Sequence, residues 1–455
     1  MESNAFLAID IGAGSGRAVI GRLSEGVLSL EEVHRFPSLP VATADGLFVD
    51  ALSLHREIVT AIGLAQDRAE ITSLGIDTWG VTCAVLDRGM SLLSNPVFYR
   101  DGRVDGVAEA VYAQLPKEAL YSLTGIQELP FNTGFMLSAL QDGGHMDGAA
   151  HVLMLPDLLA TLLTGVARVE RTNASTTQLY DPGARAWSYE AIAGMKLSPS
   201  WFTLPFVEPG EAIGDVLPAL LPHAAVRPMV VAVGSHDTAS AVAAVPATGT
   251  GWASISCGTW SLIGVERSTP VRTLSAMEAN LTNEVGVEGT IRLLRNVSGL
   301  WLLQESQRWW ASQSLERSHQ DLVDLAEAAQ PLASQFDPDH PSLLPPGDMP
   351  TRVRELCKLH GEPVPESDAA LLRAMLESTA LRYNEVLDRI ERVTGEPIST
   401  VHIVGGGSRN RLLCQLTADA CRRLVVAGPA EATAIGNVLV QAKAVGLVEG
   451  LRDMR

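Results

Sequence analysis

The stretch that decides the fold lies near the start of the chain and reads Asp10-Ile-Gly-Ala-Gly-Ser-Gly-Arg17. Apolar residues from Ala5 to Ile11 lead into its glycines and predict a buried strand. The residues from Arg17 to Leu23 continue as a second strand, so the glycines form a hairpin. A dinucleotide fingerprint needs a helix at this point and a Walker A loop needs Gly-Lys-Ser/Thr, and neither follows. The N–H groups of such a hairpin can surround a phosphate; an ordinary glycine turn is the alternative interpretation.

The same order of strand, tight turn and strand occurs again at residues 252–265, around Cys257-Gly258-Thr259. A third glycine-rich turn, Gly405-Gly-Gly407, follows a strand that begins at Val401 and precedes a helix. In that order, a helix start can approach a ligand closely. Strands and helices alternate between these turns, which favours an α/β protein. The repeat predicts a duplicated fold with a cleft between its halves.

The length of 455 residues is too great for one ordinary core, so we expect two domains of about 200 residues each. A proline and glycines between Val245 and Thr250 separate the repeated halves. We therefore expect an N-terminal domain over residues 1–245 and a C-terminal domain over residues 246–455. Prolines cluster between Gln330 and Gly361 and predict the most loosely ordered segment of the chain.

Composition excludes several kinds of partner. A net charge of −18 argues against a nucleic-acid surface and gives no attraction to an anionic membrane. No apolar run reaches the roughly 18 residues of a membrane helix, and the first residues lack the basic start of a signal peptide. The five cysteines form no metal-ligand spacing and no CxxC pair, and free thiols fit a reducing compartment. We expect a soluble cytoplasmic protein.

A lone carboxylate marks the candidate catalytic residue. Between Pro228 and Val265, Asp237 is the only Asp, Glu, Lys or Arg. It stands in Gly234-Ser-His-Asp-Thr-Ala-Ser240, after an apolar strand and before a helix of small residues. Ligands bind at such strand-to-helix junctions, where a carboxylate can act as general base for a hydroxyl group. The structural alternative is an Asp that caps the helix.

Together these motifs resemble the FGGY family of carbohydrate kinases, and the resemblance spans almost the whole chain. The stretches that carry it are Asp10–Arg17, Gly75–Val81, Gly125–Thr133, Thr172–Leu179, Ser235–Ser240, Gly258–Ser261, Asn296–Gln304, Pro346–Pro350 and Gly405–Gly407. The fold that the resemblance implies is of the actin and hexokinase type. It has two α/β, ribonuclease H-like domains and an interdomain cleft.

The resemblance also implies roles for individual residues. Asp237 corresponds to the family's catalytic base, and Asp10 to a residue that acts on magnesium through water. The substrate-binding positions are Gly80, His236, Asp237, Thr238 and Asn296. The ATP-binding positions are Ala13, Gly14, Ser15, Gly16, Arg17, Thr259, Gln304 and Gly406. The implied partners are ATP with Mg²⁺ and a small ketose.

The ketose that the resemblance implies is L-rhamnulose, phosphorylated on its 1-hydroxyl group. Its methyl group calls for an apolar wall, which Trp79, Val81, Leu129 and Phe131 could supply. Similar members carry an Asp where this chain has Thr82, a change on the sugar side. L-Fuculose, L-ribulose and D-xylulose therefore remain open as substrates, and so does a sugar-binding sensor without turnover. No heptad or interface pattern indicates an oligomeric state.

Overall fold

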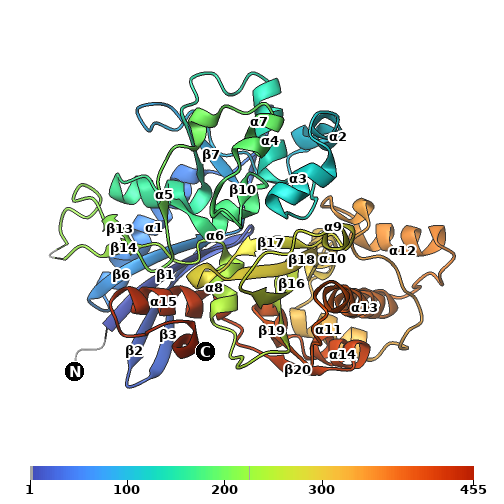
Figure 1. The fold of residues 1–455 in the computed structure, drawn as a ribbon. Coiled ribbons are helices and arrows are strands. Elements are labelled where there is room, and N and C mark those ends of the chain that lie inside the picture. The colour runs from blue at the N-terminus through green and yellow to red at the C-terminus, as the bar shows by residue number, and fades with distance from the viewer. Residues whose placement is uncertain (1–3, 225) are drawn as a thin grey trace. The chain divides into compact units, whose positions relative to one another are not determined.

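The computed structural model describes residues 4–224 and 226–455 and contains two six-stranded sheets with helices around them (Figure 1). The chain groups into two compact units. The first comprises the chain up to Pro246 with Glu266–Leu293 and Thr433–Arg455, and the second comprises Ala247–Val265 and Leu294–Ala432. The α/β class with two sheet-containing parts is confirmed. The contiguous division at residues 245/246 stays a prediction, because the compact units exchange two segments across it.

The sheet of the first unit has three neighbouring parallel strands with antiparallel strands at both edges. Strand β1 pairs antiparallel with β2 and parallel with β6, and β6 pairs parallel with β14. Residues Phe6 to Ile9 are fully buried, as expected of a strand covered on both faces. In sheet order the strands are β13 (Ala212–Asp215), β14 (Met229–Val231), β6 (Ile71–Thr78), β1 (Asn4–Ile11), β2 (Ser15–Ser24) and β3 (Val27–Pro37).

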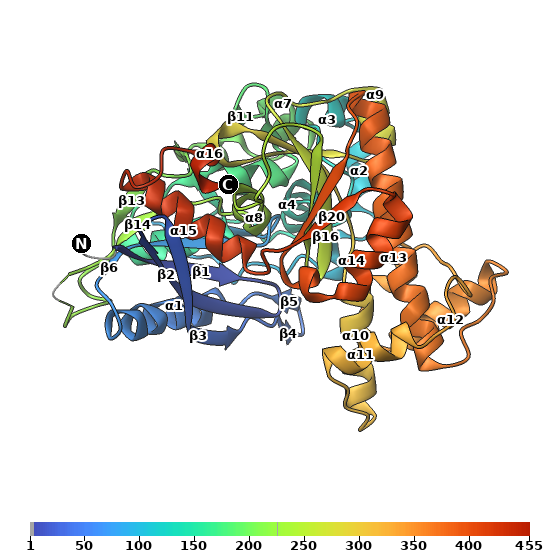
Figure 2. The same cartoon turned by 90° about the horizontal axis from the view of Figure 1, so that it is seen from below.

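Helices α15 (Ala432–Ala444) and α1 (Ala51–Gln66) cover opposite faces of this sheet, as Figure 2 shows. The face under α15 forms a cluster in which Phe6 packs with Val438. Gly21 makes the close approach possible, because a Cβ there would lie 2.6 Å from the methyl groups of Val438. The sheet is therefore buried on both faces, so polar groups are found at the ends of its strands.

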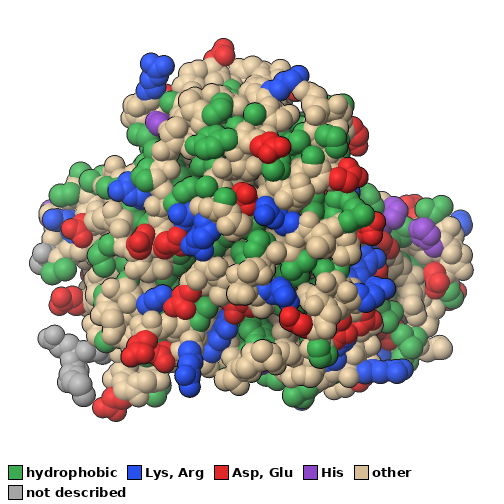
Figure 3. All heavy atoms as spheres, viewed as in Figure 1, with side chains coloured by type: hydrophobic (Ala, Val, Ile, Leu, Met, Phe, Trp, Pro, Cys, Tyr) green, Lys and Arg blue, Asp and Glu red, His purple; other side chains and the backbone are tan. Residues whose placement is uncertain are grey.

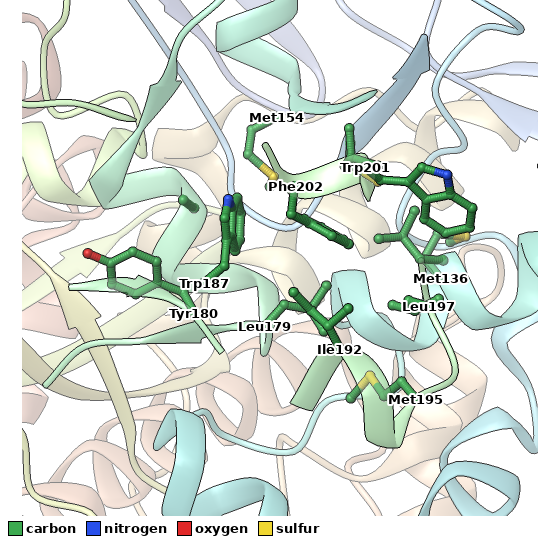
Figure 4. Packing of buried hydrophobic residues seen from close by; sticks show 14 of the residues in the cluster. Met136, Met154, Leu179, Tyr180, Trp187, Ile192, Met195, Leu197, Trp201 and Phe202 are labelled. Carbon is green, nitrogen blue, oxygen red and sulfur yellow. The ribbon is translucent and has the colours of Figure 1, made fainter. Parts of the chain in front are cut away.

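A second apolar cluster of the first unit lies away from this sheet (Figure 4). There the Trp187 ring lies between Tyr180 and Phe202, with centroid distances of 6.1 and 5.1 Å. The remaining helices of the first unit are α2 (Val107–Tyr112), α3 (Lys117–Thr124), α4 (Thr133–Asp142), α5 (Leu155–Thr164), α6 (Arg171–Ala174), α7 (Tyr189–Gly194), α8 (Asp237–Ala243), α9 (Leu274–Glu278) and α16 (Leu451–Met454).

The second unit repeats the hairpin. Strand β15 pairs antiparallel with β16 and parallel with β19, which pairs parallel with β20. This repetition confirms the predicted duplication, because β15, like β1, has one antiparallel and one parallel neighbour. The strands are β15 (Trp252–Cys257), β16 (Trp260–Arg267), β18 (Ile291–Ser298), β19 (Thr400–Val404) and β20 (Leu424–Ala427). The helices are α10 (Trp301–Ser312), α11 (His319–Glu327), α12 (Met349–Leu359), α13 (Asp368–Thr394) and α14 (Arg411–Cys421).

The prediction of loose order over residues 330–361 is wrong for residues 349–359 and stays a prediction for the rest. The segment contains helix α12, in which Asp348 is the N-cap and its side chain accepts from the backbone N–H of Thr351. Pro350 lies in the first turn, where a missing N–H costs nothing. Met349 and Val353 are buried and fix the helix on the unit. The prolines therefore start a helix here.

Charges of both signs are mixed on the face drawn in Figure 3, and the basic side chains there form no broad patch. Among the described residues, no helix is both long and apolar enough to cross a bilayer.

Candidate active site

Three aspartates lie at the carboxyl edge of the first sheet. Asp10 and Asp77 are in register near the ends of the parallel strands β1 and β6. Asp237 starts α8, and the preceding loop joins the same edge because the Thr78 N–H donates to the Ser235 carbonyl at 2.9 Å. This edge is where open α/β sheets bind ligands. The fold thus brings together carboxylates that are far apart in the sequence.

Asp10 is paired with the arginine of its own hairpin. Arg17 lies opposite Asp10 across β1 and β2, and its Nε and Nη2 donate to Asp10 Oδ2 at 3.0 and 2.8 Å. The two side chains are 20% and 13% exposed. The turn between them contains Ala13, and Gly14 and Ser15 are exposed at its tip. The predicted phosphate-binding residues therefore share one hairpin with a guanidinium held in place.

Asp77 is a member of this group that the sequence did not assign to the site. Its side chain is fully buried, and Asn437 Nδ2 donates to Oδ2 at 2.5 Å. Oδ1 has no hydrogen-bond partner within residues 4–224 and 226–455. Burial raises the pKa of Asp77 well above its ordinary value, and the negative charges of Asp10 and Asp237 raise it further. The motif around Asp77 was visible in the sequence, but its register with Asp10 was not.

Asp237 is positioned to accept a proton. His236 is the N-cap of α8 and no side chain caps the helix, so the alternative of Asp237 as the capping residue is not what the fold shows. The Asp237 side chain is 31% exposed, and Thr238 Oγ1 donates to its Oδ1 at 3.0 Å. Burial raises the pKa of Asp237, His236 opposes this effect and Asp10 adds to it. A raised pKa brings a carboxylate closer to the range of an efficient general base.

His236 contacts two further buried charges that sequence reasoning missed. Glu284 lies on β17 (Thr282–Val285), and its Oε2 is 3.1 Å from His236 Nδ1. Arg292 lies on β18, and its Nη2 is 3.2 Å from the same nitrogen and 3.2 Å from Glu284 Oε2. The opposite ring nitrogen, Nε2, is 3.4 Å from Asp237 Oδ1. No local motif distinguishes Glu284 and Arg292, so only the fold reveals them.

Glu170 holds the loop that carries His236. It is the N-cap of α6 and accepts from the N–H groups of Thr172 at 2.7 Å and Asn173 at 3.1 Å. It also accepts from the Ser235 hydroxyl at 2.6 Å. Burial raises the pKa of Glu170 although these donors oppose the rise. One buried carboxyl group therefore ties α6 to the start of the loop that carries Asp237.

The predicted sugar-side loop is strained. Val81 has φ of 64°, a left-handed conformation that is rare for a β-branched residue. Its N–H donates to Thr176 Oγ1 at 3.0 Å, and its carbonyl accepts from Thr133 Oγ1 at 2.7 Å. Next to it, a Cβ on Gly80 would lie 3.0 Å from the Thr176 methyl group. Strain of this kind persists where surrounding contacts fix it, often at functional sites.

Thr82 has a defined partner. Trp79 Nε1 donates to Thr82 Oγ1 at 2.8 Å, and Thr82 is buried. The Trp79 ring is 6.5 Å from the Tyr99 ring, which is 5.3 Å from Phe131. Leu129 is half-buried in the neighbouring loop. Trp79 and Phe131 are thus joined through Tyr99, which was absent from the predicted wall.

Of the predicted ATP-binding residues in the second unit, Thr259 follows β15, Gln304 lies in α10 and Gly406 follows β19. Thr259 Oγ1 donates to Gln304 Oε1 at 3.0 Å, so these two predicted residues are brought together. Gly406 starts the single turn Gly406–Arg409, and a Cβ on Gly407 would collide with Cys257 Sγ. Asn296 lies half-buried on β18 and belongs to the second unit as well.

The aspartate edge suits a weakly held divalent cation. Within the described parts of the chain, no group of three His, Cys, Asp or Glu side chains could hold a metal ion. Mg²⁺ does not need such a cage, since one or two carboxylates, waters and substrate phosphates complete its shell. Asp10 at the phosphate hairpin has the hard oxygen donors that this mode uses.

The chain belongs to the FGGY family of carbohydrate kinases. The N-terminal domain of that family matches residues 5–244, and its C-terminal domain matches residues 253–445.

Particular relatives and solved structures agree with this assignment. A protein of Bacteroides thetaiotaomicron named rhamnulokinase is 41% identical and covers 100% of this chain and 93% of its own length. A rhamnulokinase of Enterococcus faecalis is 39% identical, covering 100% and 92%. The structure is similar to a gluconate kinase of Lactobacillus acidophilus, with TM-score 0.81 at 14% identity over 100% and 92% of the two chains. A glycerol kinase of Plasmodium falciparum with ADP gives TM-score 0.76 at 18% identity over 99% and 91%. These structures support the fold, and the expected actin-like class is confirmed.

Proposed function

We propose that this protein transfers the γ-phosphoryl group of ATP to the 1-hydroxyl group of L-rhamnulose, giving L-rhamnulose 1-phosphate and ADP in the breakdown of L-rhamnose. The carbohydrate-kinase class follows from the family. The choice of ketose rests on full-length relatives that carry the name rhamnulokinase at about 40% identity. The observation that carries the chemistry is Asp237, a partly exposed carboxylate with a raised pKa at the edge where Asp10 and Arg17 also lie.

In the proposed reaction, Asp237 accepts the proton of the sugar hydroxyl group. The hydroxyl oxygen forms a bond to the γ-phosphorus while the bond between that phosphorus and the ADP oxygen breaks. The glycine hairpin of Ala13 to Gly16 and the Arg17 guanidinium face the transferred group and balance its charge. Thr238 donates to Asp237 Oδ1 and limits its rotation. Gly80, His236, Thr238 and Asn296 are proposed to contact the sugar, and Thr259, Gln304 and Gly406 the nucleotide.

Asp10 is the residue that we expect to hold Mg²⁺, through water or directly. When bound, such an ion supplies positive charge that neutralises the phosphate oxygens. In this structure Arg17 Nε and Nη2 donate to Asp10 Oδ2, so a cation and Arg17 would share one carboxylate. We also expect the reaction to take place in the cytoplasm, because all five cysteines are free thiols.

The contact between Thr82 and Trp79 bears on the choice of sugar. The Thr82 hydroxyl accepts from the Trp79 indole, which we propose as part of the apolar wall. Thr82 therefore influences the sugar through the position of Trp79. A methyl group in such a pocket is worth about 1–3 kcal/mol, so related ketoses should be slower and still accepted.

The test is an ADP-release assay with L-rhamnulose, L-fuculose, L-ribulose, D-xylulose and glycerol. We expect the highest kcat/KM for L-rhamnulose. Another sugar that exceeds it by more than about tenfold, or roughly 1.4 kcal/mol in transition-state binding, would reject the proposed substrate and leave the kinase chemistry intact. Sugar binding without ADP release from any sugar would favour the sensor.

A further inference from the structure

A buried ion pair lies behind the proposed base, on the far side of His236. Arg292 and Glu284 are 2% and 5% exposed, and both contact His236 Nδ1. We propose that Arg292 and Glu284 are positioning residues that hold the His236 imidazole with its Nε2–H directed at Asp237. This inference rests on the proposed function, since its effect is exerted through Asp237.

The two neighbours of Nδ1 restrict the protonation state of the ring. Arg292 Nη2 can donate to Nδ1 at 3.2 Å only if Nδ1 carries no hydrogen, and the neutral ring then carries its hydrogen on Nε2. If the ring is doubly protonated, its Nδ1–H faces Glu284 at 3.1 Å and Nε2 again carries a hydrogen. Nε2 lies 3.4 Å from Asp237 Oδ1. Both states therefore present a donor to the carboxylate.

The remaining tautomer would present the wrong group. With the hydrogen on Nδ1 alone, the Nε2 lone pair would face the lone pairs of Asp237, which is repulsive. Arg292 opposes this tautomer because its own N–H would then meet the Nδ1–H. The guanidinium is fixed for this task, since its Nε and Nη2 also donate to the Val285 carbonyl at 3.2 and 3.0 Å.

Glu284 keeps Arg292 and the ring in place. Burial alone would raise the pKa of Glu284, but His236 and Arg292 bring it below its ordinary value, so the carboxylate is ionised. A buried ion pair is weak evidence for stability, because desolvation offsets most of the attraction. The small net stabilisation does not explain why this ion pair is present. Orientation of the His236 ring does.

The consequence for the base concerns one oxygen of Asp237. Thr238 Oγ1 and His236 Nε2 both lie near Oδ1, at 3.0 and 3.4 Å. The opposite oxygen, Oδ2, is then the acceptor for the proton of the sugar hydroxyl. His236 and Asp10 act on the pKa of Asp237, and Asp237 in turn acts on the pKa values of Asp77 and Arg292. By holding the Nε2 of His236 near Oδ1, the positioning pair works against the rise in the pKa of Asp237 that burial and Asp10 cause.

The first experiment reads the tautomer without turnover. The full chain labelled with ¹⁵N-histidine contains ten histidines, and His236→Gln identifies the signals of His236. We expect the Nε2 of His236 to be protonated in the wild type across neutral pH, and Arg292→Gln to shift the ring toward the Nδ1–H tautomer. An unprotonated Nε2 in the wild type would overturn the proposal whatever the variants do.

The second experiment measures kcat and its pH dependence. Arg292→Gln should lower kcat by about tenfold and leave the KM for ATP unchanged. This loss is smaller than the whole rate enhancement that a well-positioned general base provides. The acidic limb of kcat/KM should move to higher pH, because Asp237 loses a donor that favours its charged form. Arg292→Lys keeps a donor and should recover part of kcat.

Controls separate positioning from folding. Arg292→Gln leaves Glu284 unpaired, so the double variant Arg292→Gln/Glu284→Gln, which removes both charges at similar volume, is measured as well. Glu377→Gln is the matched control, because Glu377 is 3% exposed and bonds Arg373 at 2.6 Å within α13. It should lower stability and leave the pH profile unchanged. A wild type inactive on every ketose would reject the proposed function; an active wild type with unaltered folded variants would reject only the positioning pair.

Discussion

The hairpin of β1 and β2 and the hairpin of β15 and β16 are paired in the same way within their sheets but carry different side chains. Each pairs antiparallel within itself and parallel with the next strand. The first carries Asp10 and Arg17, with Asp77 on the adjacent strand. The turn of the second carries Cys257 and Thr259, which are uncharged. One backbone plan thus supplies a charged edge, where we propose proton and phosphoryl transfer, and an uncharged turn, where we propose that the nucleotide binds.

Asp237→Asn should give the largest effect, because it removes the proposed base from the charged edge. We expect kcat to fall by about 10²- to 10⁴-fold. Calorimetry should show a Kd for L-rhamnulose within about tenfold of the wild type, since the volume is unchanged. Undiminished ADP release would remove Asp237 from the mechanism.

Arg17→Gln tests whether the charge of the first hairpin acts on the phosphoryl group. We expect kcat/KM for ATP to fall by about 10²-fold, as for the loss of one donor to a developing oxyanion. Arg17→Lys should retain part of the activity, because a lysine binds phosphate as a point charge. Equal activity of all three proteins would mean that Arg17 serves only as the partner of Asp10.

Asp77→Asn should replace a buried carboxyl group by an amide of similar size while Asn437 keeps a polar partner. Because the pKa of Asp77 is raised in the folded state, its destabilising effect begins above the ordinary pKa of an Asp and grows until the pH reaches the raised pKa. The variant should therefore gain stability at pH 8 relative to pH 5, with about 2–4 °C in Tm for each kcal/mol.

Thermal denaturation at the two pH values measures this gain. A Tm gain that is equal at pH 5 and pH 8 would contradict the raised pKa of Asp77.

Thr259→Val should give the smallest effect, because it removes one neutral hydrogen bond from the second hairpin. The bond to Gln304 is worth about 0.5–1.5 kcal/mol, so the KM for ATP should rise by roughly two- to tenfold with kcat nearly unchanged. A loss of kcat comparable to that of Asp237→Asn would erase the proposed difference between the two edges.

The sequence predicted the hairpins and the duplicated α/β plan because both depend on local patterns. Asp237 could be selected as the single charge in a long uncharged stretch. Glu284, Arg292 and Glu170 could not, since their meaning comes from contacts with residues distant along the chain. The segment around Pro350 was misjudged because proline starts helices as readily as it ends them.

The left-handed Val81 has a consequence for engineering. A residue held in such a conformation stores about 1–3 kcal/mol, and here Thr133 and Thr176 supply the bonds that retain it. Replacing Val81 by glycine relieves that energy and also frees the loop that we propose as part of the wall around the sugar. At this position, glycine favours thermal stability, whereas valine favours sugar selectivity.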